Sequence, residues 1–523
     1  MKRVHRAATT IVVATSAVAL SVPLAAADPG QQTGRFVAGA DGIGDPYFPL
    51  AGNGGYDVSH YDITGRYDPA TDVWTATTEV SATATQDLYS FNLDLVGMEV
   101  GSVVVNDETA RWSRTDTELV LVPQKKIKSG EPIDVIVAYA GVPHEFALPA
   151  PGFVVRTGFM ATDDGANVAG QPDVAAGWFP VNDHPLDKAS YTFRVTVPQA
   201  LDVVANGHLT GRSTAGGWET FTWDASAPMA SYLATIDIGE WDIRQGTTES
   251  GLPVYDAVDP DLLTGRNTRL GRSIDASLAR QGEVVDVLAD HFGPYPFDTV
   301  GAIIDDQDDL YFALETQTRP VYSKYFWPDY GDFVLAHELA HQWYGDDVAL
   351  ARWQDIWLNE GFATYAEWIW AEHEGFFTAQ MVFDDVMGPN GIPADDPFWD
   401  LVIGAPPVDN LFDNAVYLRG GLTLQALRQE VGDEAFWEIL QTWASKNSGG
   451  HGTTPEFIAL AEEISGTQLD ALFDAWLFTG EKPAVGVAMA ATTEVGTQAA
   501  TSADAEVSSW LDRSERQHQS GRY

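Results

Sequence analysis

The sequence predicts an α+β protein of several domains, in which an antiparallel β-rich half precedes a mainly helical half. Between Gly54 and Gly246, short runs of alternating apolar and polar residues are separated by turn residues, a spacing typical of antiparallel strands. From Leu252 onward, apolar residues recur three and four positions apart, as in helices that bury one face. At 523 residues, the chain is also long enough for more than one hydrophobic core.

The first residues predict a secretory signal peptide at positions 1–27. Lys2, Arg3 and Arg6 form a basic start, an apolar run follows, and the alanines up to Ala27 offer small residues for cleavage. An uncleaved membrane anchor is the alternative, but the apolar run is short and rich in Ala for a spanning helix. We therefore expect an extracellular protein that has no membrane segment after cleavage near Ala27.

The two main domains are predicted at 36–248 and 249–483. Alternating runs such as WTATTEVSATA, LYSFNLDL, IDVIVAYAG and YTFRVTVP indicate the strands of the first domain. Helical periods in LGRSIDASLARQGEVVDVLADHFG, FVLAHELAHQWYG and YLRGGLTLQALRQEVG, with a strand such as DTVGAIID, indicate the second. Residues 490–523 are rich in Ala, Thr, Ser and Gly, which predicts a flexible low-complexity tail.

The composition excludes several classes of function. A formal net charge of −46 repels nucleic acid and anionic membranes. The absence of cysteine from the sequence excludes disulfides, thiol catalysis and cysteine-ligated zinc. Any metal must therefore be held by His, Asp or Glu side chains.

The stretch VLAHELAHQWYGD contains the strongest chemical signal. His337 and His341 are four residues apart, so on a helix both imidazoles lie on one face and can reach one ion. Glu338 lies beside that face, where it can take a proton from a metal-bound water. An amphipathic helix that happens to carry histidines is the alternative, and a third ligand distinguishes the two interpretations.

The spacing of the third ligand separates the classes of metalloprotease. The metzincin pattern places a Gly and a third His at positions where this chain has Tyr344 and Asp347, so that class is excluded. Eighteen residues after His341 comes Glu360, in WLNEGFATYAE. A carboxylate there completes a set of two His and one Glu with one position left for water, which is typical of catalytic zinc.

HELAH, eighteen residues and then the Glu of NEGFA resemble the zinc aminopeptidases of the aminopeptidase N and leukotriene hydrolase family, which are gluzincins. Thermolysin-type endopeptidases share the ligands, but their spacing is one residue longer and they lack WLNEGFA. The segments DNAVYLRGGLTLQALRQEVGDEAFWEIL, TTPEFIALAEEISGTQLDALFDAWL and AAGWFPVNDHPLDKASYTFRVTVP are also similar to the family. The resemblance covers Phe36 to Pro483 and implies a saddle-like β domain, a thermolysin-like catalytic domain and one Zn²⁺ ion.

The resemblance also implies roles for individual residues. His337, His341 and Glu360 match the zinc ligands of the family, and Glu338 matches its general base. Tyr417, in AVYLRGG, matches the tyrosine that donates a hydrogen bond to the oxyanion beside the metal. Without its context, Tyr417 would be interpreted as a half-buried aromatic residue of a helix.

A further implication concerns the free amino group of the substrate. The family holds this group with a glutamate in a Gly-x-Met-Glu-Asn segment, which aligns here with FALET. Glu315 is the corresponding glutamate, Ala313 belongs to the same substrate-binding segment, and Phe312 replaces the Gly. Gln171 occupies the place of a second anchor on the β domain, with Asp173 as a candidate companion, although a local turn would also explain these residues.

Other polar residues are interpreted as structural. They are His373 at a solvated helix end, His184 in a turn, and the acidic pairs Asp305-Asp306 and Asp308-Asp309 in an exposed connection rather than a calcium loop.

The sequence thus predicts a secreted zinc aminopeptidase that acts on peptides with a free N-terminus and has no nucleic-acid partner. An endopeptidase or an epoxide hydrolase on the same zinc site is one alternative. A zinc-bearing binding protein without catalysis is another. The preferred first residue of the substrate, the effect of Phe312 and Thr316, and the oligomeric state are not predicted.

Overall fold

The computed structural model of the chain describes residues 35–150, 153–327, 330–484 and 500–519. The predicted signal peptide at 1–27 lies outside these residues. Within them, every helix is too short or too polar to cross a bilayer.

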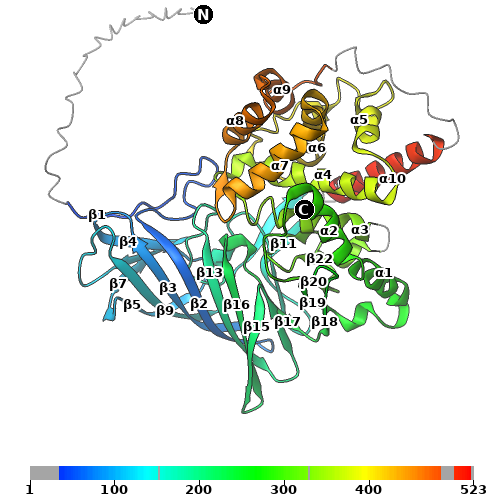
Figure 1. The fold of residues 1–523 in the computed structure, drawn as a ribbon. Helices are drawn as coiled ribbons and strands as arrows, with labels where there is room; N and C mark the ends of the chain where they lie inside the picture. The colour runs from blue at the N-terminus through cyan, green and yellow to red at the C-terminus, as the bar shows by residue number, and fades with distance from the viewer. Residues whose placement is uncertain (1–34, 151–152, 328–329, 485–499, 520–523) are drawn as a thin grey trace, which may run out of the picture. The chain divides into compact units, whose positions relative to one another are not determined.

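The first half of the chain is built around a large sheet with the described strand order β15-β16-β13-β2-β3-β9-β5-β6 (Figure 1). Its strands are β2 (Tyr56–Asp68), β3 (Val73–Ala84), β5 (Glu99–Val105), β6 (Glu108–Thr109), β9 (Pro132–Gly141), β13 (Ala189–Pro198), β15 (His208–Ala215) and β16 (Trp218–Met229). Along β3, Trp74, Ala76 and Val80 are buried while Thr75 and Glu79 are exposed, which is the one-sided pattern expected from the sequence.

One strand pair of this sheet differs from the purely antiparallel arrangement that was expected for the domain. β13 pairs with β2 in parallel, although the other pairs of the sheet are antiparallel. The chain leaves β2 at Asp68 and reaches β13 only at Ala189, and such a long connection allows a parallel crossover. Strand alternation in the sequence does not distinguish the two directions.

Two smaller sheets complete the β domain. Their described strand orders are β1-β4-β8-β7 and β10-β11-β12-β17-β14. The strands are β1 (Val37–Ala38), β4 (Leu88–Asp94), β7 (Arg111–Arg114), β8 (Glu118–Val122), β10 (Glu145–Ala150), β11 (Phe153–Ala161), β12 (Ala166–Ala169), β14 (Asp202–Ala205) and β17 (Ile236–Gly239).

The second half begins with a mixed sheet of described order β18-β19-β20-β22-β21. Its strands are β18 (Asp242–Thr247), β19 (Pro253–Val258), β20 (Val300–Asp305), β21 (Ala313–Leu314) and β22 (Val321–Ser323), and β23 (Ala349–Leu350) pairs separately with β24 (His451–Gly452). β18 precedes the expected boundary at 248 but pairs with β19, so this sheet takes its first strand from the end of the predicted β domain. β21 lies at the edge of the sheet and carries part of the FALET segment.

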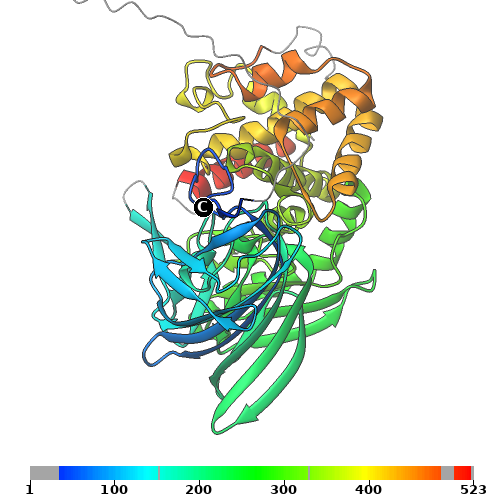
Figure 2. The ribbon, with the colours of Figure 1, turned by 90° about the vertical axis from the view of Figure 1, so that its left-hand side faces the viewer.

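Helices make up most of the second half, as expected. They are α1 (Thr268–Leu278), α2 (Gln281–Phe292), α3 (Gly331–His341), α4 (Trp357–Glu374), α5 (Ala379–Met387), α6 (Asn414–Val431), α7 (Asp433–Asn447), α8 (Thr454–Ser465), α9 (Asp470–Leu477) and α10 (Ala500–Gln519). α4 is central, because it contacts α2, α3, α5 and α6. Figure 2 shows these helices gathered on one side of the strands, which confirms the α+β class predicted from the sequence.

Part of the flexible tail expected at 490–523 is a helix instead, while residues 490–499 and 520–523 lie outside the described residues. Residues 500–519 form α10, which contacts α5 and α6. Val507 and Trp510 of this helix are buried, at 1% and 0% exposure. A helix forms here because Val507, Trp510 and Leu511 recur three and four positions apart and give it one apolar side. The Ala- and Ser-rich composition around these residues hides this helical period in the sequence.

Candidate metal centre and active site

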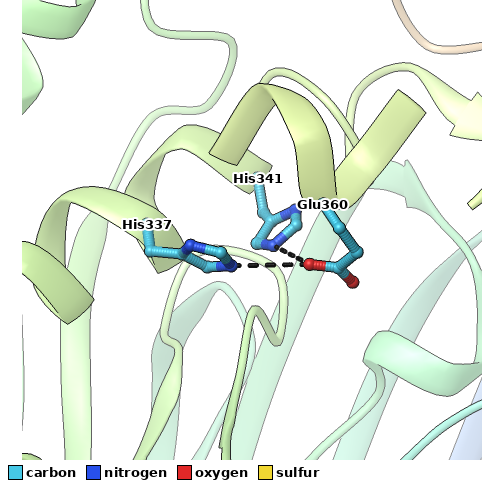
Figure 3. Close-up of side chains that lie close together, drawn as sticks. All are labelled: His337, His341 and Glu360. Atoms are coloured by element: carbon cyan, nitrogen blue, oxygen red, sulfur yellow. Dashed lines mark ion pairs between the residues drawn. The ribbon is translucent and has the colours of Figure 1, made fainter. Parts of the chain in front are cut away.

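Two helices position the predicted metal ligands. α3 is buried along almost its whole length, so His337 and His341 project from one face of it into the interior. α4 packs against α3 and brings Glu360, in its first turn, to the same point. Figure 3 shows the two imidazoles converging on one carboxylate oxygen.

The distances between these side chains fit three ligands of one zinc ion. The Nε2 atoms of His337 and His341 each lie 3.4 Å from Oε2 of Glu360. Ligands about 2.0–2.1 Å from a tetrahedral zinc ion are separated from one another by roughly 3.3–3.4 Å. All three side chains are no more than 2% exposed, so the donor set is shielded from competing water. Nitrogen and carboxylate donors of this kind suit zinc.

Both histidines are held in the orientation that frees Nε2 for a metal. Nδ1 of His337 lies 2.9 Å from Oε1 of Glu367, and Nδ1 of His341 lies 3.0 Å from the carbonyl oxygen of Tyr344. A proton on Nδ1 satisfies each of these acceptors and leaves the Nε2 lone pair as the donor to the ion.

The electrostatics of the centre favour a cation. Burial alone would lower the pKa of His337, but hydrogen bonds to Glu360 and Glu367 outweigh it and raise this pKa to about 9. Burial would raise the pKa of Glu360, but His341 and His337 outweigh it and lower this pKa to about 2. The carboxylates therefore stabilise positive charge at the point where the imidazoles converge.

Glu338 lies beside the ligands, where the general base was predicted. It is 1% exposed, and its Oε1 atom has no hydrogen-bond partner among the described residues. Burial raises the pKa of Glu338 to about 8, although His337 and His341 partly oppose this. A bound divalent cation would favour the carboxylate form, because a nearby positive charge lowers the pKa of an acid.

Tyr417 approaches the same centre from α6. Its side chain is 1% exposed, and its ring centroid lies 6.0 Å from that of His337, with the two planes 24° apart. Two glycines allow this approach: a Cβ atom added to Gly361 of α4 would lie 2.9 Å from the backbone of Gly420 of α6. The glycines of NEGFA and LRGG therefore set the distance between α4 and α6.

Glu315 also reaches the metal centre. It follows β21, is 2% exposed, and accepts a hydrogen bond of 3.0 Å from the hydroxyl of Tyr232 in the β domain. Carboxylate oxygens of Glu315 and Glu338 and a ring nitrogen of His341 lie within 4.8 Å of one another. Burial raises the pKa of Glu315, and Glu360 adds to this effect, while His341 opposes it.

Gln342 ties the Glu315 segment to the metal-binding helix. It directly follows His341 and is fully buried. Its Nε2 atom donates to the carbonyl oxygen of Glu315 at 3.1 Å, and its Oε1 atom accepts from the backbone of Thr318 at 2.7 Å. Thr318 has a φ of 69°, an unfavourable backbone conformation for a β-branched residue, so these contacts hold a strained turn beside the site.

Gln171 and Ala313 lie together at a small cavity. The cavity, of about 20 Å³, is lined by Gln171, Ala313, Phe312 and Phe412, among others. That volume holds about one water molecule. Oε1 of Gln171 has no hydrogen-bond partner among the described residues, so it is available to a ligand. Asp173, the candidate companion of Gln171, does not line this cavity.

The other polar residues have structural contacts. His373 lies in the last turn of α4 at 3.2 Å from Glu283, and His184 accepts a turn hydrogen bond from the backbone of Leu186 at 3.1 Å. One expectation is wrong: Asp305 is only 4% exposed, because it ends the buried strand β20 instead of lying in an exposed connection.

Several residues of the site were missed from the sequence. Glu367 lies seven residues after Glu360, which is two turns along the same helix face, so spacing could have revealed it. Gln342 and Tyr232 have no local pattern that marks them. Trp510 donates from Nε1 to Oε2 of Glu367 at 2.9 Å, from a segment that was expected to be flexible.

Comparison with known families gives two matches, in chain order. The Peptidase M1 N-terminal domain matches residues 58–233, and the Peptidase family M1 domain matches residues 331–476. The second match contains His337, His341, Glu360 and Tyr417.

Solved structures and curated proteins give consistent similarities. An M1 zinc metallopeptidase of Deinococcus radiodurans, in a mutant form bound to a Tyr-Ser-Ala substrate, is 29% identical, with a TM-score of 0.73 over 85% of this chain and 99% of that chain. Rice aminopeptidase M1-D is 26% identical over 59% of this chain and 36% of its own length. Human glutamyl aminopeptidase is 26% identical over 58% of this chain and 33% of its own length. The chain thus spans about a third of the length of these curated relatives.

The two family matches cover more than half of the chain, and the structural match extends over both domains. The donor set of two His and one Glu agrees with the zinc of the structural relative. The chain belongs to peptidase family M1, and its metal is a single zinc ion.

Proposed function

We propose that this protein is a secreted zinc-dependent aminopeptidase that removes N-terminal residues from peptides by attack of a zinc-activated water. The observation that carries this proposal is the position of Glu315. A carboxylate oxygen of Glu315 lies within 4.8 Å of a carboxylate oxygen of Glu338 and of a ring nitrogen of His341. The curated relatives are aminopeptidases by name, which also supports the proposal.

The length of an amino acid explains why this position matters. The α-nitrogen of a peptide lies about 2.5 Å from the carbonyl carbon of the first residue, given the N–Cα and Cα–C bond lengths. A group that binds the ammonium must therefore lie within a few ångströms of the attacking water. An internal peptide bond would bring a neutral amide to Glu315 and would leave its buried carboxylate without a charged partner, which is unfavourable. The site thus favours free amino termini.

In this proposal, each residue of the centre would have its own role in the reaction. Zinc, when bound by His337, His341 and Glu360, acidifies the attacking water and polarises the scissile carbonyl. Glu338 takes the proton of that water and later passes it to the leaving amine. Tyr417 donates a hydrogen bond to the oxygen that gains negative charge.

The remaining residues orient the substrate. Glu315 accepts hydrogen bonds from the ammonium, and the hydroxyl of Tyr232 holds the orientation of Glu315. Oε1 of Gln171 offers a second acceptor from the β domain. Ala313 lies on the edge strand β21, whose outer side can pair with an extended substrate backbone.

The proposal is tested by hydrolysis of one peptide in two forms, with a free and with an acetylated N-terminus, each with and without a zinc chelator. We expect release of the first residue from the free form alone, and loss of this release on chelation. Internal cleavage of both forms would assign an endopeptidase instead. No cleavage of either form would favour a binding protein.

Export is the second part of the proposal, and it rests on the basic start, apolar run and alanines of residues 1–27. In the source cells, we expect the protein in the medium with a new N-terminus close to Asp28. Protein that stays inside the cells with Met1 intact would contradict export.

A further inference from the structure

The C-terminal helix α10 is anchored through one buried face. Val507 and Trp510 are 1% and 0% exposed, and Ser514 is 6% exposed. These residues are three and four positions apart, so they lie on one side of the helix. The helix contacts α5 and α6, and Trp510 on its buried side also reaches α4.

Trp510 makes both an apolar and a polar contact in this position. Its ring lies edge-on to Trp368, with centroids 5.8 Å apart, and tilted against Phe377, with centroids 6.0 Å apart. Its Nε1 atom donates a hydrogen bond of 2.9 Å to Oε2 of Glu367. The acceptor is a buried carboxylate, and hydrogen bonds to charged groups are stronger than those between neutral groups.

Glu367 is the residue that orients a zinc ligand. Its Oε1 atom lies 2.9 Å from Nδ1 of His337, and the hydroxyl of Tyr330 donates to the same Oε2 atom as Trp510 does. Three donors thus fix the plane of this carboxylate: His337 on α3, Tyr330 directly before α3, and Trp510 on α10. Outer partners of this kind set the ring orientation of a metal-binding histidine and the basicity of its other nitrogen.

We propose that α10 is a positioning element of the zinc site, and that Trp510 acts through Glu367 to hold His337. The indole N–H keeps Oε1 of Glu367 directed at Nδ1 of His337, and this leaves Nε2 of His337 directed at the ion. Without the indole, Oε2 loses one of its two described donors, Tyr330 and Trp510, so the carboxylate is less constrained against rotation. Trp510 is thus a positioning residue that lies 173 positions after His337, the histidine whose orientation it supports.

The test measures zinc affinity, by competition with a chromophoric chelator. Trp510→Phe keeps an aromatic ring against Trp368 and Phe377 but removes the N–H donor. We expect zinc binding about tenfold weaker, at the lower end of the range for outer partners of metal ligands. Trp223→Phe is the matched control, because Trp223 is also 0% exposed and donates from Nε1 at 3.0 Å, but to the backbone of Val203 in the β domain. We expect its zinc affinity to be unchanged.

A double-mutant cycle separates positioning from general packing. Glu367→Gln should weaken zinc binding by itself, by about tenfold or more. On that background, Trp510→Phe should add less than about twofold, since residues that act through one partner are not additive. Equal losses from Trp510→Phe on both backgrounds, or an equal loss in Trp223→Phe, would overturn the proposal.

A milder variant covers the case in which Trp510→Phe does not fold. Val507→Ala removes only two methyl groups from the same buried face of α10, and we expect zinc binding about twofold to threefold weaker. The role of α10 would be contradicted if Val507→Ala binds zinc with unchanged affinity while Trp510→Phe either does the same or does not fold. The inference rests on the zinc site of the proposed function, but zinc affinity is measured without any substrate. Its failure is therefore distinguishable from failure of the aminopeptidase activity.

Discussion

The metal-binding half and the substrate-binding half of the site are built in different ways. His337, His341 and Glu360 come from α3 and α4, two helices that are close in the chain and packed against each other. Glu315, Gln171 and the residues around them come from an edge strand and from two segments of the β domain. On the proposed function, a local motif would determine where water is activated, and the tertiary structure would determine which substrate reaches it.

Four substitutions test this division, and the largest effect is expected in the metal half. Glu338→Gln removes the proton acceptor but none of the zinc ligands, so kcat should fall by about 10³- to 10⁴-fold. Zinc content, measured by atomic absorption, should stay at one ion per chain. Normal turnover in this variant would remove Glu338 from the mechanism.

Tyr417→Phe should have the next largest effect, because it removes a donor to the developing oxyanion. We expect kcat about 10²- to 10³-fold lower, with little change in KM or in zinc affinity. Tyr365→Phe is a suitable control: Tyr365 is also buried, but its hydroxyl donates to Gln425 at 2.8 Å. A comparable loss in both variants would indicate a packing effect instead of oxyanion stabilisation.

Glu315→Gln addresses the substrate half. The amide keeps the shape of the side chain but removes the charge that binds an ammonium, so kcat/KM on free peptides should fall about 100-fold. N-acetylated peptides, which lack the ammonium, should stay uncleaved by the variant, as by the unchanged protein. The exposed substitution Glu249→Gln serves as the control. A rate on free peptides that does not fall in Glu315→Gln, or that falls as much in Glu249→Gln, would contradict an amine anchor.

Phe312→Ala should give the smallest effect, on the choice of first residue. Phe312 is 5% exposed and lines the cavity of about 20 Å³ beside Gln171, so its removal enlarges the space for a side chain. We expect the ratio of kcat/KM for large over small first residues to rise about tenfold. The loss of a buried ring also costs about 3 kcal/mol of stability, so Phe193→Ala, a buried Phe of β13, controls for stability alone. An unchanged ratio would exclude Phe312 from the pocket.

The same division explains what the sequence could predict. The spacing of His337 and His341 on a helix face is a local property, and the order of strands and helices follows from periodicities of two and 3.6 residues. The parallel pairing of β13 with β2 and the contact between Trp510 and Glu367 join distant segments. Neither leaves a local pattern, because tertiary packing alone brings these segments together.

The central claim is that both halves act on one substrate molecule. The most direct measurement is a crystal structure of the zinc-loaded Glu338→Gln variant with an uncleaved tripeptide. The account predicts zinc about 2.0–2.2 Å from His337, His341 and Glu360, and the ammonium nitrogen within hydrogen-bond distance of Glu315. An internal peptide bond at the zinc, with the N-terminus far from Glu315, would contradict it.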